Sequence, residues 1–215
     1  MTYVICGLNG SLEKYNKLKE AARIGKNDIV YMLGGIAADD LSLLTELSMC
    51  ENVYPVMDKS DYTALKMLGG FDKMLKSGET PDAKYITEMK KWVADGGQSV
   101  LDSYRTFDAD MKEGVLDYLG DFALFEETDV KGKEYLLLSA GITGFSQDTD
   151  LYDLEPSNFI SKPLDMDKKY FSDKMIVTAS AKQEYSEITQ VANNICLACG
   201  RAACIRLEDG EKFYV

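Results

Sequence analysis

The sequence predicts an α/β (α+β) fold, in which mixed β-sheets are flanked by helices. Three successive segments, at residues 3–24, 28–50 and 53–68, repeat an apolar strand, a loop and a helix. Residues from about 69 to 119 have a helical pattern, and short apolar runs typical of strands resume after them. Because such repeats give parallel strands whose loops meet at one edge of a sheet, we predict a single domain over residues 1–215 with a helical insertion over that edge.

The individual elements follow from apolar runs and turn residues. The first strand is expected at residues 3–6, before a turn at residues 7–10 and Ser11 as the N-cap of a helix. The second strand, at residues 29–33, stops at Gly34-Gly35. The later expected elements are a strand at 53–57, a loop at 58–61, helices punctuated at 69–70, 77–78 and 96–97, a strand at 122–127, a hairpin turn at 131–133, a strand at 135–138, a polar loop at 147–173 with one helical turn near Pro156, and strands at 175–177, 195–199, 203–207 and 212–214.

The composition argues against several classes of protein. A formal net charge of -12 disfavours an extended nucleic-acid surface, because phosphate backbones are bound by Lys and Arg. The N-terminus lacks a basic segment and no apolar run approaches the roughly 18 residues of a membrane span, so we expect a cytoplasmic protein that does not enter membranes. Five irregularly spaced cysteines fit reduced thiols, and the absence of histidine removes the commonest general base and transition-metal ligand.

The loop after the second predicted strand lacks reactive side chains. In open α/β sheets, ligands bind beyond the carboxyl ends of the strands. Those positions hold Gly35, Ile36, Ala37 and Ala38, none of which can ligate a metal, transfer a proton or attack a substrate. This absence of reactive side chains is the main observation that the sequence offers about function.

Other parts of the chain keep a scaffold whose order and spacing are characteristic. The scaffold residues are those at 53–55, 62, 64–68, 92, 96–97, 140–141, 170–171, 174–177 and 206–211. The pattern resembles the calcineurin-like metallophosphoesterases over nearly the whole chain, and among them the bacterial lambda-type serine/threonine phosphatases and symmetrical dinucleoside tetraphosphatases. This resemblance implies a sandwich of two mixed sheets flanked by helices, with a two-metal centre at the sheet edge.

The metal-binding motifs of that family are altered at every ligand. The family has Gly-Asp-x-His-Gly, Gly-Asp-x-x-Asp-Arg-Gly and Gly-Asn-His-Glu after its first three strands, and two later histidines. The resemblance places Gly7 at the first Asp, Asn9 at the first His, Gly35 at the bridging Asp, Ala38 at the second Asp of that motif, Asp39 at its Arg, Lys59 at the ligand Asn, Ser60 at the proton-donating His, Ser139 and Ser180 at the later His ligands, and Lys162 at the phosphate-binding Arg.

These replacements predict that both divalent metals and all catalytic residues are absent. A two-metal site needs carboxylates and imidazoles to hold the cations that polarise a phosphoryl group and supply hydroxide. Glycine, alanine and serine cannot do this. The ammonium of Lys59 would also repel a cation, by roughly 4 kcal/mol for unit charges about 4 Å apart at an effective dielectric of about 20.

Two other groups of residues could bind a metal, one of carboxylates and one of cysteines, and each also has a simpler structural interpretation. Four acidic residues near the edge could form a displaced magnesium or calcium site, although acidic loop side chains are usually solvated: Asp39, Asp40, Asp58 and Asp61. The cysteines of Cys196-x-x-Cys199, with Cys6 and Cys204, suggest zinc. Because residues three apart on a strand point to opposite faces, we favour buried thiols instead.

The sequence therefore favours a pseudophosphatase, a catalytically inactive homologue that acts as a binding or regulatory protein for an unknown partner. One alternative is a residual serine/threonine phosphatase-like phosphoesterase with a rearranged metal site. Another is a small-anion or phosphate binder formed by Asn9, Gly10 and Lys59, with amides at the start of the first helix and help from Lys162 or Lys182. Against that alternative, Lys59 could extend into solvent or pair with Asp58 or Asp61.

If the loops kept the geometry of the family, restoring the ligands together would restore metal binding. The combined replacement is Gly7→Asp, Asn9→His, Gly35→Asp, Lys59→Asn, Ser60→His, Ser139→His and Ser180→His. Single replacements are expected to restore nothing, because residues that act as a unit have non-additive effects.

Overall fold

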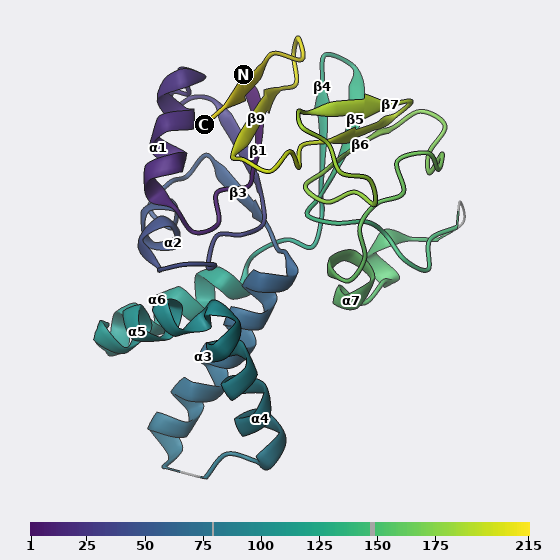
Figure 1. Ribbon diagram of the computed structural model, residues 1–215. Helices are drawn as coiled ribbons and strands as arrows, with labels where there is room; N and C mark the ends of the chain where they lie inside the picture. The colour runs from purple at the N-terminus through teal and green to yellow at the C-terminus, as the bar shows by residue number, and fades with distance from the viewer. Residues whose placement is uncertain (79, 147–148) are drawn as a thin grey trace.

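The computed structural model describes residues 1–78, 80–146 and 149–215, and its two five-stranded sheets form a sandwich (Figure 1). The first sheet has the strand order β10-β9-β1-β2-β3. Its strands β1 (Thr2–Cys6), β2 (Ile29–Leu33) and β3 (Val53–Val56) are parallel to one another. On the other side of β1, β9 (Ala203–Arg206) is antiparallel both to β1 and to β10 (Lys212–Tyr214).

The second sheet has the order β4-β5-β6-β8-β7 and is also mixed. Strands β4 (Glu126–Val130) and β5 (Lys133–Leu138) form the predicted hairpin. Strands β6 (Met175–Thr178) and β8 (Asn194–Cys196) run parallel to β5, and β7 (Thr189–Val191) is antiparallel to β8. The predicted sandwich of two mixed sheets flanked by helices is therefore confirmed.

The alternation of side chains along β1 shows how the layers are built. Tyr3 and Ile5 pack in a cluster that includes residues of α1 (Leu12–Ala21) and α2 (Ser42–Leu47), so these helices cover the outer face of the first sheet. Val4 instead packs in the core between the sheets, with residues of the second sheet. This period of two is the pattern expected of a strand covered on both faces.

The outer face of the second sheet has its own apolar cover. Leu136 and Ile176 point into a third cluster, which contains Phe159 of α7 (Pro156–Ile160). The helical turn expected near Pro156 is this helix, and a short 3-10 turn, Leu151–Asp153, precedes it. Residues 147–148 of the expected 147–173 loop lie outside the described residues.

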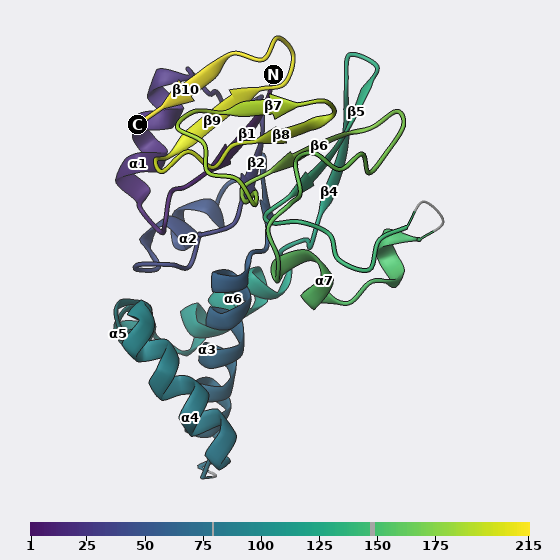
Figure 2. The same cartoon turned by 45° about the vertical axis from the view of Figure 1, so that its right-hand side comes forward.

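The predicted start of the helical insertion, at about residue 69, lies within a longer helix. Helix α3 (Lys59–Ser77) starts directly after its N-cap Asp58 and continues through Gly69-Gly70, so the expected loop at 58–61 is a cap and a first turn. The remaining insertion comprises α4 (Ala83–Trp92), a π-helical turn at Val93–Gly97, α5 (Gln98–Thr106) and α6 (Ala109–Gly120). Figures 1 and 2 show these helices extending from one edge of the sandwich.

The structure corrects two other predicted strands and adds a third that was not predicted. The strand expected at 122–127 is β4 at Glu126–Val130, because residues 122–125 instead lead from α6 and form only an isolated bridge, between Val56 and Ala123. Strand β7 was not predicted, and β8 ends at Cys196 rather than at residue 199. Among the described residues, no helix has both the length and the apolar character needed to cross a membrane.

Candidate functional site

The candidate site lies where parallel strands from both sheets end, and we call this region the loop edge. It consists of the residues that follow β1, β2 and β3 in the first sheet and β5 and β6 in the second. The two sheets are joined there, because the buried hydroxyl of Ser139 after β5 donates a hydrogen bond to the carbonyl of Met57 after β3, 2.6 Å away. The loops after β3 and β5 therefore meet at this edge.

The loops after β1 and β2 are held together by backbone contacts. The Gly10 amide donates to the Gly35 carbonyl at 2.7 Å, and a Cβ on Gly35 would lie 3.7 Å from Oδ1 of Asn9. Since the Gly10 amide is used within the protein, it is not free for the anion site predicted with Asn9 and Lys59. Gly7 has φ of 75°, and a Cβ there would lie only 2.6 Å from the carbonyl oxygen of Arg201.

The most deeply buried acidic side chain at the loop edge is Asp61, in the first turn of α3. Its carboxylate accepts hydrogen bonds from the amides of Ile36 and Ala37, at 2.9 and 2.8 Å, and so fixes the loop after β2. Burial, followed by the neighbouring Asp58 carboxylate, raises the pKa of Asp61 well above its ordinary value despite these amide bonds. Asp58 is itself the N-cap and accepts from the Ser60 hydroxyl at 2.6 Å.

The loops of the second sheet are also tied internally. The amide of Gly141 donates to the carbonyl of Lys162 at 2.7 Å, and the amide of Leu164 donates to the carbonyl of Ser180 at 2.9 Å. The buried Thr178 hydroxyl donates to the Ala140 carbonyl at 2.9 Å. The backbones of the Ser139, Lys162 and Ser180 loops thus brace one another.

The helical insertion contacts the loop edge at Asp39. The hydroxyl of Ser99 in α5 donates to the Asp39 backbone carbonyl. Ala37 and Ala38 line a cavity of about 680 Å³ between this loop and the insertion, which we call the groove. Its other lining residues are Asp58, Lys59, Ser60, Tyr62, Thr63, Lys66, Met67, Glu88, Lys91, Trp92, Asp95, Gly96, Gly97 and Val100.

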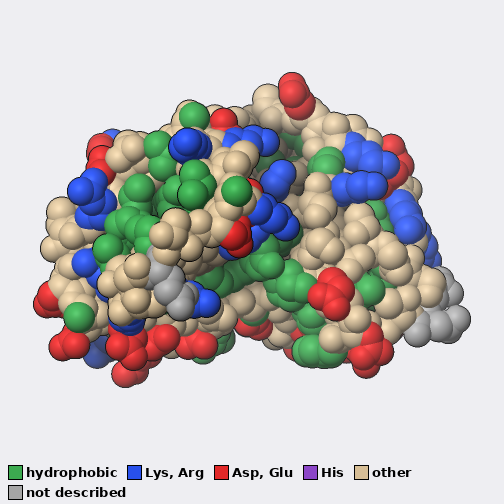
Figure 3. All heavy atoms as spheres, turned by 90° about the horizontal axis from the view of Figure 1, so that it is seen from below, with side chains coloured by type: hydrophobic (Ala, Val, Ile, Leu, Met, Phe, Trp, Pro, Cys, Tyr) green, Lys and Arg blue, Asp and Glu red, His purple; other side chains and the backbone are tan. Residues whose placement is uncertain are grey.

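The groove combines apolar side chains with ammonium groups. Figure 3 views the molecule from this side, where hydrophobic side chains line a hollow bordered by basic ones. Lys66 is paired with Glu88 at 2.7 Å, whereas Lys59 and Lys91 are exposed and have no ion-pair partner among the described residues. Lys59 therefore extends without pairing to Asp58 or Asp61, and it also lines an adjoining cavity of about 410 Å³ beside α7.

The residues at the loop edge do not fit a metal centre. In the part of the chain that the structure describes, no three His, Cys, Asp or Glu side chains are grouped so that they could hold a metal ion. Asp61 is committed to the loop amides, and Asp39 and Asp40 are not gathered with it into such a group. The cysteines are free, and Cys199 lies in a turn beyond β8.

Several functional features were not predicted from the sequence. The role of Asp61 as the anchor of the neighbouring loop was missed, although Asp58-x-x-Asp61 before an apolar helix is a readable capping-box signal. The groove was also missed, because it forms between α3 and segments about 30 residues later in the chain. Trp92, one of the scaffold residues, is half-buried and both packs on the core and lines the groove.

Lys182 also departs from its suggested role near the site. Its ammonium pairs with Asp165 at 2.7 Å, and Lys162 is exposed without an ion pair among the described residues. The pairing raises the pKa of Lys182 and lowers that of Asp165. Lys182 is therefore neutralised locally and adds little positive charge for an anion at the loop edge.

Comparisons with known proteins support the fold. No protein-family model and no curated protein matches the sequence. Among solved structures, a "putative diadenosine tetraphosphatase" matches with a TM-score of 0.62 and 11% identity, over 100% of this chain and 92% of that one. A hypothetical protein from Pyrococcus horikoshii OT3 matches with a TM-score of 0.52 and 16% identity, over 100% and 87%. At such identities the likeness concerns the fold alone, which is phosphatase-like.

Proposed function

We propose that this protein is a catalytically inactive metallophosphoesterase homologue that acts by binding a ligand or partner in the groove. The observation that supports this most strongly is the chemistry of the loop edge, where Gly7, Gly35 and Ser139 offer no metal-binding charge. The polar groups that are present there stabilise the loops themselves, as the Ser139 and Asp61 hydrogen bonds show. What remains accessible is a groove with apolar walls and unpaired lysines.

The groove favours a ligand that has both apolar surface and negative charge. Tyr62 and Trp92 supply aromatic surface, which suits contacts with rings or aliphatic side chains. In the part of the chain that the structure describes, Lys59 and Lys91 have no ion-pair partner, although Asp58 and Asp95 also line the groove. An acidic segment of a partner protein with exposed apolar side chains has this chemistry.

An assay of hydrolysis tests the first half of the proposal. Wild-type protein in buffer with manganese is expected to hydrolyse an aryl phosphate no faster than buffer alone, because the described residues include no group that could hold the cations that activate water. The matched variant is Asp58→Asn. Of the two neighbouring carboxyl groups, Asp58 and Asp61, it removes the one that is not fully buried. Turnover by the wild type that disappears in Asp58→Asn would overturn the proposal in favour of a rearranged hydrolase.

The groove can be tested with its own fluorophore, since Trp92 is the single tryptophan of the chain. Anilinonaphthalene sulfonate, an aromatic anion, is the probe. We expect saturable quenching of Trp92 that weakens several-fold in Lys59→Met/Lys91→Met, because two unpaired charges are removed. The control Lys169→Met, an exposed lysine outside the groove, should bind like the wild type. Equal quenching in the double variant, or no saturation, would contradict an anionic ligand.

A second candidate is a binder of small anions at Lys59, favoured by its unpaired position between two cavities. Inorganic phosphate would then cause saturable NMR shifts at the loop edge that vanish in Lys59→Met. Lys91→Met is the matched control, because it lies in the same groove away from the adjoining cavity. No shift at tens of millimolar phosphate rejects this candidate.

A further inference from the structure

Helix α4 forms one wall of the groove but is hardly anchored in the core. Glu88, Lys91 and Trp92 of this helix line the groove, together with Ala37 and Ala38 of the loop edge. No residue of α4 is buried. Trp92, at the C-terminal end, is the one α4 residue among those described that packs against the apolar cluster outside the first sheet.

The other helices of the insertion are anchored in that cluster. Each of α3, α5 and α6 contributes two buried side chains to it: Ala64 and Leu68, Val100 and Tyr104, and Val115 and Leu119. Helices in proteins are stabilised mainly by packing of an apolar face, and segments with few buried apolar contacts open locally at low free energy. Helix α4 is therefore the helix of the insertion that should open most easily.

The contacts that tie α4 to α3 are weak. Lys66 and Glu88 form a solvent-exposed ion pair at 2.7 Å. The Tyr85 hydroxyl donates to the carbonyl of Met67 at 2.7 Å, and its ring lies so close to Gly70 that a Cβ there would overlap it. An exposed ion pair and a neutral hydrogen bond each contribute little net stability, so breaking both is not prohibitive.

The backbone is interrupted on both sides of α4. Helix α3 ends at Gly78, which has φ of 68°. The π-helical turn after α4 contains a kink at Gly96, where φ is 112° and a Cβ would meet nothing within 4 Å. Kinks at glycine and π turns change the direction of a helix, and residues at the ends of elements absorb the rotation in hinge movements. The Gly96 kink therefore has the properties of a hinge.

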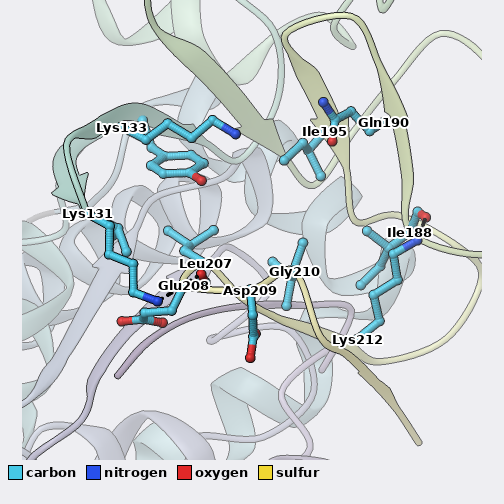
Figure 4. A pocket seen from close by; sticks show the side chains of 13 residues that line it. Lys131, Lys133, Ile188, Gln190, Ile195, Leu207, Glu208, Asp209, Gly210 and Lys212 are labelled. Atoms are coloured by element: carbon cyan, nitrogen blue, oxygen red, sulfur yellow. Dashed lines mark hydrogen bonds between the residues drawn. The ribbon is translucent and has the colours of Figure 1, made fainter.

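Another cavity, of about 390 Å³, has walls of a different kind (Figure 4). It is lined by residues of the β4–β5 and β9–β10 hairpins. Strand β5 pairs with both β4 and β6, and β9 pairs with both β1 and β10. The sheets hold these walls in place, whereas the groove has a wall that only a few contacts hold.

We propose that α4 is a flap that swings about the Gly96 kink and so opens and closes the groove. Its purpose rests on the proposed function, since the flap would admit the ligand of the groove and then retain it. Opening breaks the Lys66–Glu88 and Tyr85–Met67 contacts and moves Trp92 and Lys91. Figures 1 and 2 show α4 alongside α3 at the outer end of the insertion, so this movement leaves the sheets undisturbed.

Hydrogen exchange of the intact protein without ligand tests the movement. Corrected for intrinsic rates, the α4 amides should exchange together and about 100-fold faster than those of α5. Tyr85→Phe should speed α4 exchange about three- to tenfold further, because it removes the bond to the Met67 carbonyl. The matched control is Tyr118→Phe in α6, which removes a buried hydroxyl without a hydrogen-bond partner and should leave α4 exchange unchanged. Protection of α4 equal to that of α5, or no effect of Tyr85→Phe, would overturn the flap.

Exchange in the presence of anilinonaphthalene sulfonate tests the link to the groove, with Trp92 quenching as the measure of occupancy. At ten times its dissociation constant, the probe should slow α4 exchange about tenfold, because it holds the flap closed. Saturable quenching with unchanged α4 exchange would overturn the flap while the groove ligand stands. No quenching, with fast α4 exchange that Tyr85→Phe accelerates, would contradict the proposed ligand and support the flap.

Discussion

At the scale of single residues, the loop edge is built from polar groups that hydrogen-bond to the protein itself. The Ser139 hydroxyl connects the two sheets through the Met57 carbonyl, and the Asp61 carboxylate holds two amides of the loop after β2. A buried polar group with satisfied partners stabilises a unique arrangement, whereas the loss of one partner leaves the other desolvated. These residues therefore have structural roles that can be measured.

The first prediction concerns Ser139→Ala. Removing the hydroxyl takes away the hydrogen-bond donor of the buried Met57 carbonyl. The free energy of unfolding should therefore fall by about 1–3 kcal/mol. Urea denaturation measures the change. The control is Ser172→Ala, whose exposed hydroxyl bonds only the adjacent Asp173, and its stability should stay within about 0.5 kcal/mol of wild type. Equal effects of the two variants would show that the contact between sheets is unimportant.

The second prediction uses the raised pKa of Asp61. A raised folded-state pKa means that the native protein keeps a proton that the unfolded chain, with an ordinary value near 3.8, has already released. This carboxyl group therefore lowers stability as the pH rises above about 4 toward the folded-state value. Asp61→Asn can still accept from the Ile36 and Ala37 amides but cannot ionise.

Urea denaturation of wild type and Asp61→Asn at pH 5 and pH 8 checks this sign. From pH 8 to pH 5, the wild type should gain stability relative to the variant, because the other titrating groups are common to both proteins. If the difference between the two proteins is independent of pH in this range, Asp61 is already charged in the native state at pH 5 and the assignment is wrong.

At the scale of elements, the sequence predicted the layers better than the loops. Strands such as β1 and β2 were predictable because their apolar runs are uninterrupted and bounded by glycine. The start of α3 was misplaced because Asp58 to Asp61 was interpreted as a polar loop, when the same residues form a capping box. Two other features depend on tertiary contacts and not on local sequence. Strand β7 is only three residues long, which is too short for a recognisable pattern, and the groove is formed by segments that are distant in sequence.

The meeting of the loops at one edge could be predicted from the sequence, because parallel strands bring their carboxyl ends together. The backbone geometry within those loops could not. No sequence signal indicated that Gly7 would pack against the Arg201 carbonyl with a positive φ. The expectation that restored ligands would rebuild a metal site assumed that this backbone could accept an aspartate, and the contact argues against it.

The third prediction compares two glycines that share a backbone conformation. Gly7 and Gly200 have φ of 75° and 74°, but a Cβ on Gly200 meets nothing within 4 Å. Gly200→Ala should therefore cost about 1 kcal/mol for the left-handed backbone alone. Gly7→Ala should cost about 3 kcal/mol, because the new methyl group also overlaps the Arg201 carbonyl. Equal losses in thermal or urea unfolding would mean that the Gly7 loop can relax.

At the scale of the whole molecule, a central sandwich carries a helical insertion at one edge, and the groove lies between the two. The groove holds Lys59 and Lys91, which have no ion-pair partner among the described residues, in a chain with an excess of acidic residues. Under the proposed function, this phosphatase-like fold serves for binding and not for hydrolysis.

The most direct test of the central claim is the metal content of the protein after reconstitution. Protein purified without chelator, incubated with manganese, iron or zinc and then desalted should contain far less than one metal ion per chain by elemental analysis, because the loop edge has no ligand set to offset dehydration of a divalent cation. The sevenfold variant with restored ligands should be equally empty, since Gly7→Asp does not fit its loop. About one or more metal ions per wild-type chain, lost in Asp58→Asn, would contradict the account.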